Sequence, residues 1–170
     1  YIVVGGRHFG FLAEETLKNL PEVDVVVRGE GEVTFKELCD RIVQGKGFDG
    51  VEGISYRTDG RIVNANDRKV PDDLDLFRVY DPQDPASLEV GELLGHTKTD
   101  FRNSYFPVHA TRGCPNKCVY CSLTASKVRF RSIPSIIQEI RDKIRATGVR
   151  NVSFTDSSLT INKAFVTGLC

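Results

Sequence analysis

Apolar and polar positions alternate in blocks along the first half of the chain. An apolar run over residues 1–4 precedes a segment, 12–20, in which apolar residues recur every three or four positions, and a continuous apolar run follows over 23–27. Recurrence every three or four positions predicts a helix, and a continuous apolar run is typical of a strand covered on both faces. The pattern therefore predicts a strand, a helix and a buried strand.

The next block predicts a turn over 29–32, a second helix that ends near Gly45, and a hairpin. The expected buried stripe of that helix is Phe35, Leu38, Cys39, Ile42 and Val43. Asp59-Gly60, between the strand patterns over 53–57 and 61–65, is a strong hairpin signal. The resulting order, β-α-β-α-β-β, predicts half of a doubly wound α/β domain.

A further βα pattern follows in the second half. Residues 106–111 form a strand pattern that leads into a loop rich in cysteine, and 151–154 form another strand pattern, with Asp156 at its end. Between them a helix is predicted, with Ser132 as its N-cap and Gly148 just past its end. The apolar stripe of this helix is Ile133, Ile136, Ile137, Ile140 and Ile144. Residues 66–105, rich in Asp and Pro, are predicted to be a linker.

Composition narrows the class of protein. Lys+Arg and Asp+Glu balance at 23 each, so we expect no nucleic-acid partner. No apolar run approaches the roughly 18 residues of a membrane span, and the start does not resemble a signal peptide. The 170 residues contain no methionine, which leads us to expect an internal piece of a longer protein. The odd number of cysteines, with most of them in one tight cluster, does not resemble a secreted disulfide framework, so we expect a cytoplasmic location.

Three of the five cysteines, Cys114, Cys118 and Cys121, crowd into eight residues with the spacing C-x3-C-x2-C. Thiolates are soft ligands suited to iron–sulfur clusters and to zinc. Three of them in one loop can bind three irons of a cubane and leave the fourth iron open for a small molecule. The alternative is a closed zinc site completed by His96 or His109.

The run from Thr111 to Cys121 resembles the signature of the radical S-adenosylmethionine (SAM) superfamily. The resemblance implies a [4Fe–4S] cluster on the three cysteines, with SAM bound to the open iron and reduced to a 5′-deoxyadenosyl radical. It also implies that Tyr120 lies near the adenine and that Asp156 is a polar contact to SAM. Arg112-Gly113 is familiar from the same signature, without a clear role.

The glycine-rich turns after residues 3–4 and 23–27 resemble the C-terminal half of the cobalamin-binding domain fused to many radical SAM enzymes. The implied cobalamin-contacting residues are Gly5, Gly6, His8, Gly29, Glu30 and Glu32, with Gly31 as a further matching glycine. Glycine lets a backbone approach a ligand closely, whereas the same residues also serve purely structural turns and helix starts.

The expected fold class is therefore α/β, in three parts. Residues 1–65 are expected to be part of a Rossmann-like cobalamin-binding domain, 66–105 a linker, and 106–170 the first βα units of a partial (β/α) radical SAM barrel. The resemblance includes the group of the magnesium-protoporphyrin ester cyclase.

The function expected from this organisation is methyl transfer or oxidative cyclisation on a small-molecule substrate, supported by an external one-electron reductant. Two alternatives stay open: a radical SAM enzyme whose N-terminal domain binds no cobalamin, and a zinc-stabilised interaction module. No catalytic residue is identified beyond the cofactor ligands. We expect these 170 residues alone to be inactive and, because strand edges are exposed, prone to association.

Overall fold

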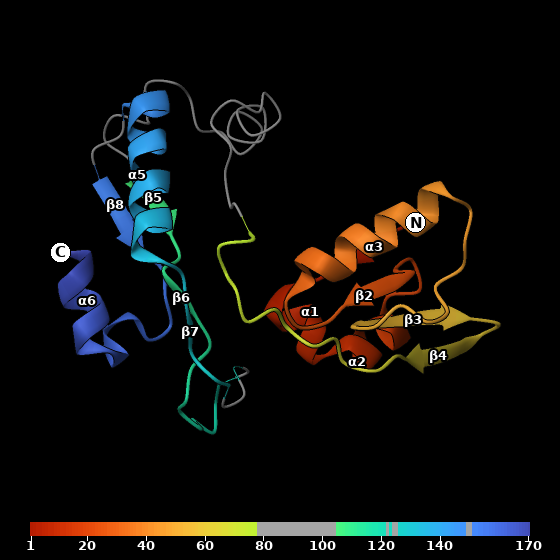
Figure 1. Cartoon of the computed structure of the whole chain (residues 1–170). Helices are drawn as coiled ribbons and strands as arrows, with labels where there is room; N and C mark the ends of the chain where they lie inside the picture. Colours follow the sequence, from red (N-terminus) through yellow and green to blue (C-terminus); the bar gives the residue numbers. More distant parts are fainter. Residues whose placement is uncertain (78–104, 122, 124–125, 149–150) are drawn as a thin grey trace. The chain divides into compact units, whose positions relative to one another are not determined.

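A computed structural model describes residues 1–77, 105–121, 123, 126–148 and 151–170 (Figure 1). The chain divides into two compact units, Tyr1–Pro71 with Val119–Leu123 and Asp72–Cys118 with Thr124–Cys170. Most of the predicted linker, including His96, lies outside the described residues. No helix within the described ranges is long and apolar enough to cross a membrane.

The first unit is a four-stranded sheet with helices on both faces (Figure 1). The strands are β1 (Val3–Val4), β2 (Val25–Val27), β3 (Ile54–Thr58) and β4 (Arg61–Asn64), and the helices are α1 (Gly6–Phe11), α2 (Ala13–Asn19) and α3 (Gly31–Val43). The strand order is β1-β2-β3-β4; β1 and β2 are parallel, and the other two pairs are antiparallel. The predicted order of strands is confirmed, with two helices, α1 and α2, in place of the single helix predicted between β1 and β2.

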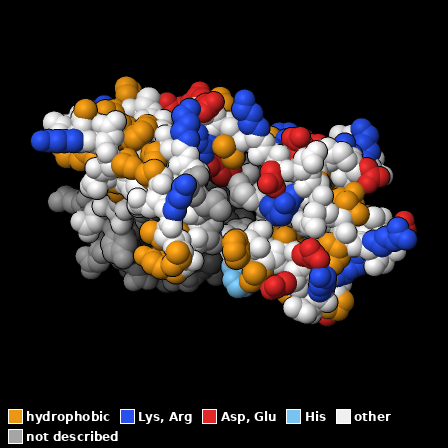
Figure 2. Space-filling view, turned by 90° about the horizontal axis from the view of Figure 1, so that it is seen from below, with side chains coloured by type: hydrophobic (Ala, Val, Ile, Leu, Met, Phe, Trp, Pro, Cys, Tyr) orange, Lys and Arg blue, Asp and Glu red, His pale blue; other side chains and the backbone are white. Residues whose placement is uncertain are grey.

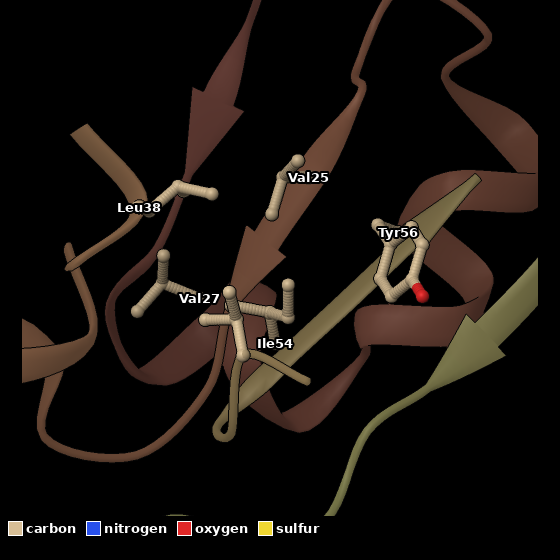
Figure 3. Close-up of a cluster of buried hydrophobic side chains, with 6 residues drawn as sticks. Val25, Val27, Leu38, Ile54 and Tyr56 are labelled. Carbon is tan, nitrogen blue, oxygen red and sulfur yellow. The ribbon is translucent and has the colours of Figure 1, made fainter. Parts of the chain in front are cut away.

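The buried run of β2 supplies two cores because successive side chains of a strand point to opposite faces. Val25 and Val27 pack with Leu38 of α3 (Figure 3), whereas Val26 packs with Leu17 of α2. All three valines are buried. The prediction that this apolar run is a strand covered on both faces is therefore confirmed.

The predicted hairpin at Asp59-Gly60 is confirmed. Both turn residues have positive φ, 48° and 73°, which is the conformation of a two-residue type I′ turn. The turn joins β3 to β4 with Thr58 opposite Arg61.

The stripe predicted for α3 is wrong in part. Leu38 is fully buried, but Phe35 is 50% exposed and Val43 is 87% exposed. Cys39 is only half-buried. Thr34, which was not predicted to be buried, is fully buried. The helix therefore turns the face that contains residues 34 and 38 toward the sheet, and not the neighbouring face that contains residues 35, 39 and 43.

The starts of the helices also differ from the prediction. Gly6 already belongs to α1, and a break at Leu12 separates α1 from α2. Gly31 and Glu32, predicted as part of a turn, form the first turn of α3, and Glu30 is its N-cap. The helix predicted over 12–20 corresponds to α2, and the acidic residues Glu30 and Glu32 do open the second helix, but α1 was missed because its residues show no apolar periodicity.

The second unit contains a βαβ arrangement with an inserted hairpin (Figure 1). Its elements are β5 (Tyr105–Val108), β6 (Thr111–Arg112), β7 (Arg129–Phe130), α5 (Ile133–Thr147), β8 (Asn151–Phe154), η2 (Leu159–Ile161) and α6 (Lys163–Leu169). β5 and β8 are parallel, with Val108 opposite Phe154, and β6 pairs antiparallel with β7. The strand predicted over 106–111 is therefore two strands, of which the second belongs to the inserted hairpin.

Helix α5 has the predicted limits, although Ile144, the last residue of its predicted stripe, is 39% exposed. The Ser132 hydroxyl oxygen accepts the backbone N–H of Ser135 at 3.2 Å, and Gly148 ends the helix with a left-handed φ of 70°. Ile136 is fully buried and packs with Val108 and Ala110. Because capping and periodicity are local, both helix ends could be predicted.

Charged side chains of both signs are interspersed on the surface. On the face shown in Figure 2, Lys and Arg side chains alternate with Asp and Glu side chains among apolar atoms. Exposed (i, i+4) pairs such as Lys18–Glu14 and Lys36–Asp40 are part of this pattern. The distribution agrees with the balanced composition.

Candidate metal and cofactor site

The cysteine loop leaves β6 and returns at β7, and its two ends are held together by the antiparallel pairing of these strands, with Arg112 opposite Arg129. Cys114 is fixed further by Ser126. The Cys114 N–H donates to the Ser126 hydroxyl oxygen at 3.2 Å, and the Ser126 N–H donates to the Cys114 carbonyl at 2.9 Å. The first cysteine therefore has a defined backbone position.

Gly113 is required by the backbone at this point. Its φ of +100° is unfavourable for residues with a side chain, and a Cβ built there would meet the Lys127 carbonyl oxygen at less than 3.0 Å. The loop can close only if its two arms approach this tightly. This gives a physical role to the glycine before Cys114, which the sequence left unexplained.

Asp156, at the end of β8, holds the start of the cysteine loop. Its Oδ1 accepts the Ala110 N–H at 3.0 Å and the Thr111 hydroxyl at 2.6 Å, and it also accepts the Thr111 N–H. Its Oδ2 lies 3.2 Å from the Ala110 nitrogen. A carboxylate that accepts several donors fixes them in space, so Asp156 couples the end of β8 to the entrance of the loop.

Thr155 and Ser158, which lie on either side of Asp156 in the sequence, also contact the cysteine loop or the segment that leads into it. The Thr155 hydroxyl lies 3.2 Å from the His109 ring nitrogens, and the Ser158 hydroxyl lies 3.4 Å from the Cys114 sulfur. The Ser158 hydrogen bond, followed by hydrogen bonds from Asn116, lowers the pKa of the Cys114 thiol below its ordinary value. A lower pKa favours the thiolate, which is the form that binds metals.

The three predicted ligands differ in their surroundings. Cys114 is half-buried, whereas Cys118 and Cys121 are exposed, and Val119 and Tyr120 between them are almost fully exposed. Cys114 and Cys118 belong to the second unit, while Cys121 and Tyr120 fall in the segment that groups with the first. Among the described residues, no three His, Cys, Asp or Glu side chains are gathered as metal ligands.

The donor set nonetheless fits an iron–sulfur cluster by its chemistry. All three thiols are free, they lie within eight residues, and the first is already polarised by a hydroxyl donor. For the zinc alternative, the His109 ring contacts Thr155, and His96 lies outside the described residues.

A buried ionic cluster contacts the segment that leads into the cysteine loop. The Arg131 guanidinium donates to the His109 carbonyl at 3.1 Å and pairs with Glu139, and Lys143 pairs with Glu139 at 2.8 Å. Burial pushes the pKa of Glu139 upward, but the hydrogen bonds from Lys143 and Arg131 outweigh burial, so the pKa lies below its ordinary value. The carboxylate therefore stays ionised between two buried cations.

The described start of the linker contacts the same region. The Asp75 carboxylate accepts the Ser132 N–H at 3.1 and 3.2 Å, next to Arg131. Leu74 is buried, and the Arg112 guanidinium lies 5.6 Å from the centre of the Phe77 ring. Residues 74–77 therefore contact both the entrance of the cysteine loop and the start of α5.

The residues predicted to contact cobalamin lie in the first unit, at one edge of its sheet. Gly5 follows β1 and Gly29 follows β2, and these strands are parallel neighbours. Gly6 and Gly29 have positive φ, 85° and 70°, with no other atom within 4 Å of where a Cβ would lie. These two glycines therefore leave open space beside the backbone.

The other predicted contacts have mixed roles. His8 is exposed on α1 and its ring packs edge-on against Phe9. Glu30 is the N-cap of α3 without a side-chain cap hydrogen bond, and Glu32 is the acidic residue of the first turn. Gly31 lies near Val27, whose Cγ1 would be 3.2 Å from a Cβ there, so this glycine serves packing within the unit.

Sequence reasoning missed Ser126, Thr155 and Ser158. Each acts on a residue between 12 and 46 positions away, so no local pattern marks it. The only available signal was the polar run Asp156-Ser157-Ser158 at the end of a strand that neighbours the strand leading into the cysteines.

No protein-family model matches the chain. An uncharacterized methyltransferase of Pyrococcus horikoshii is 33% identical over 96% of this chain and 34% of its own length. The anaerobic magnesium-protoporphyrin IX monomethyl ester cyclase of Synechocystis is 29% identical over 99% of this chain and 33% of its own length. The cobalamin-dependent radical SAM methyltransferase TokK of Streptomyces tokunonensis is 30% identical over 75% and 19%. The chain spans about a third or less of these relatives.

Solved structures share the fold. The radical SAM methyltransferase TsrM from Kitasatospora setae aligns over 98% of this chain and 32% of its own, with a TM-score of 0.73 and 20% identity. The cobalamin-dependent SAM radical enzyme OxsB aligns over 92% and 21%, with a TM-score of 0.67 and 20% identity. At this identity the likeness concerns the α/β fold.

Proposed function

This chain is homologous to cobalamin-dependent radical SAM methyltransferases and to the magnesium-protoporphyrin cyclase, and on that premise we propose that the protein carrying it is a radical SAM enzyme. Cys114, Cys118 and Cys121 would hold a [4Fe–4S] cluster with one open iron for SAM. When bound, the cluster supplies one electron to the SAM sulfonium, which releases methionine and a 5′-deoxyadenosyl radical. The observation that carries the proposal is the three-thiol loop whose first cysteine is held by Ser126 at its backbone N–H and by Ser158 at its sulfur.

The loop residues divide the work of binding. Cys114 would provide the ligand with a fixed backbone, and the exposed Cys118 and Cys121 would provide the other two ligands. Exposure of the Tyr120 ring leaves it free to stack on the adenine of SAM. Asp156 positions the loop through Oδ1, and its Oδ2 retains lone-pair capacity for a donor on SAM.

The first unit is proposed to bind cobalamin. The support is the pair of open, left-handed glycines, Gly6 and Gly29, at the ends of neighbouring parallel strands. Gly5 and Glu30 lie next to them, His8 lies in the short helix α1, and Glu32 lies in the first turn of α3. A bound cobalamin could carry a methyl group to an otherwise unreactive carbon of a small-molecule substrate, with an external one-electron reductant restoring the cluster.

Anaerobic reconstitution of the protein with iron and sulfide tests the cluster. We expect a brown protein with broad visible absorption, bound iron and sulfide, and production of 5′-deoxyadenosine from SAM under reduction. Alanine at Cys114, Cys118 or Cys121 should abolish all three results. Cys170→Ala is the matched control, because Cys170, like Cys118 and Cys121, is an exposed free cysteine but lies outside the loop. A colourless protein that binds zinc instead would identify the interaction-module alternative.

Cobalamin binding is tested separately. The protein reconstituted with hydroxocobalamin should retain the corrinoid through gel filtration, and Gly29→Val should reduce its retention because a side chain would fill the space beside the backbone. Gly45→Val is the control, since Gly45 also has a positive φ and open surroundings but follows α3. A protein that forms the cluster but retains no corrinoid would favour an N-terminal domain without a cofactor.

A further inference from the structure

The segment that follows β8 runs along the segment that follows β5, and three of its side chains make contacts in matching order. Thr155 contacts His109, Asp156 contacts Ala110 and Thr111, and Ser158 contacts Cys114. The parallel pairing of β5 with β8 sets this register. The contact between Ser158 and the sulfur is thus the last step of an ordered series, held by the two contacts before it.

We infer that the Ser158 hydroxyl donates a hydrogen bond to the ligating sulfur of Cys114 and so sets the reduction potential of the cluster, whose presence is the function proposed above. The 3.4 Å separation between Oγ and Sγ is within the range for a hydrogen bond to sulfur. A thiolate bound to iron has no proton of its own, so the hydroxyl is the donor in the loaded protein.

The direction of the effect follows from charge. Reduction adds one negative charge to the cluster and its ligands, and a donor aimed at a ligand sulfur stabilises the more negative state. Ser158 therefore raises the potential and makes the cluster easier to reduce. The effect is specific to one ligand, because Cys114 is half-buried beside Ser158, whereas Cys118 and Cys121 are exposed.

A potentiometric titration followed by electron paramagnetic resonance tests this in the reconstituted protein. Ser158→Ala should bind the same iron and sulfide as the unchanged protein but titrate at a more negative potential. At the midpoint of the unchanged protein, the ratio of reduced to oxidised cluster should fall roughly tenfold, equivalent to about 59 mV for one electron. Ser158→Thr, which keeps the hydroxyl, should restore the original midpoint.

Thr160→Ala is the matched control, because Thr160 is an exposed hydroxyl residue two positions later in η2; its midpoint should not move. A fully loaded Ser158→Ala protein with an unchanged midpoint would overturn the inference while leaving the proposed function intact. Absence of iron and sulfide from the unchanged protein would instead overturn the proposed function.

A second measurement covers the case in which Ser158→Ala does not load. Pulsed electron paramagnetic resonance of the reduced cluster in H₂O and D₂O should detect an exchangeable hydroxyl proton coupled to the cluster, in both the unchanged protein and Ser158→Thr. If neither protein shows such a proton, Ser158 is not a donor to the ligand and the inference is wrong.

Discussion

The Thr111 hydroxyl donates to Oδ1 of Asp156 at 2.6 Å, across 45 residues of sequence. The same carboxylate accepts the N–H groups of Ala110 and Thr111. Removing it leaves two backbone donors in a largely buried place, since Ala110 is fully buried and Thr111 nearly so. An unpaired buried donor costs about 1–3 kcal/mol.

Asp156→Ala should therefore lower the free energy of unfolding by about 2–6 kcal/mol, measured by urea denaturation of the protein that carries this chain. Thr111→Val is the control, because it removes the hydroxyl bond but leaves both N–H groups paired; its loss should be about 1 kcal/mol. Equal losses in the two variants would show that the carboxylate does not hold the backbone.

Gly113→Ala should prevent cluster assembly. The added Cβ would meet the Lys127 carbonyl at less than 3.0 Å and would stand at a φ of +100°, so the two arms of the loop must separate. Iron and sulfide bound after reconstitution measure the effect. We expect a loss of most of the bound iron.

Gly148→Ala separates the close approach from the conformational preference alone. Gly148 also has a left-handed φ, but nothing lies within 4 Å of its Cβ position. That variant should lose about 1 kcal/mol of stability and load iron normally. Full iron binding in Gly113→Ala would show that the arms need no such approach.

Glu139→Gln should be strongly destabilising at neutral pH. It would leave the guanidinium of Arg131 and the ammonium of Lys143, which are 6% and 7% exposed, without their shared carboxylate. Breaking a buried pair in this way costs about 3–5 kcal/mol. Glu14→Gln is the control, because the Glu14–Lys18 pair is exposed, and its stability should not change measurably.

The pH dependence of the same variant follows from the lowered pKa of Glu139. Its carboxylate contributes stability at pH values above the ordinary value of 4.5, and this contribution is lost as the pH falls through the lower pKa of the folded protein. The difference in unfolding free energy between the unchanged protein and Glu139→Gln should therefore shrink below pH 4.5. A difference that stayed constant there would contradict the assignment.

Asp75→Asn should loosen residues 74–77 from the start of α5. The carboxylate receives the Ser132 N–H and lies beside Arg131, and a negative charge at a helix N-terminus is favourable. We expect a loss of about 1 kcal/mol by urea denaturation.

Asp72→Asn serves for comparison. Asp72 pairs with Lys127 through side chains that are mostly exposed, and such pairs contribute little. If Asp72→Asn were as destabilising as Asp75→Asn, surface charge rather than the helix start would explain both.

Local signals predicted some elements closely. Strand 151–154, the limits of α5 and the Asp59-Gly60 hairpin follow from periodicity, caps and turn residues, each of which acts within a few positions. The orientation of α3 could not be predicted from these local signals. Thr34 is buried while Phe35 is half-exposed, because packing against the sheet decides which face of the helix is buried.

The candidate site was predictable only as a set of ligand types. The spacing of the cysteines indicates iron–sulfur chemistry without any structure. The support for Cys114 was not predictable, because Ser126 and Ser158 reach it through folding of the hairpin and pairing of β5 with β8. Ser158 is 44 residues from Cys114 in the sequence, so no local sequence pattern indicates that the two residues are in contact.

The contact between Ser158 and Cys114 also orders events during synthesis. The ribosome makes Cys114 first and Ser158 44 residues later, and β8 must leave the exit tunnel before it can pair with β5. Until then the Cys114 sulfur lacks its contact with the Ser158 hydroxyl. If the loop holds the proposed cluster, the first ligand would reach its final surroundings only after Ser158 has been made, 44 residues after Cys114.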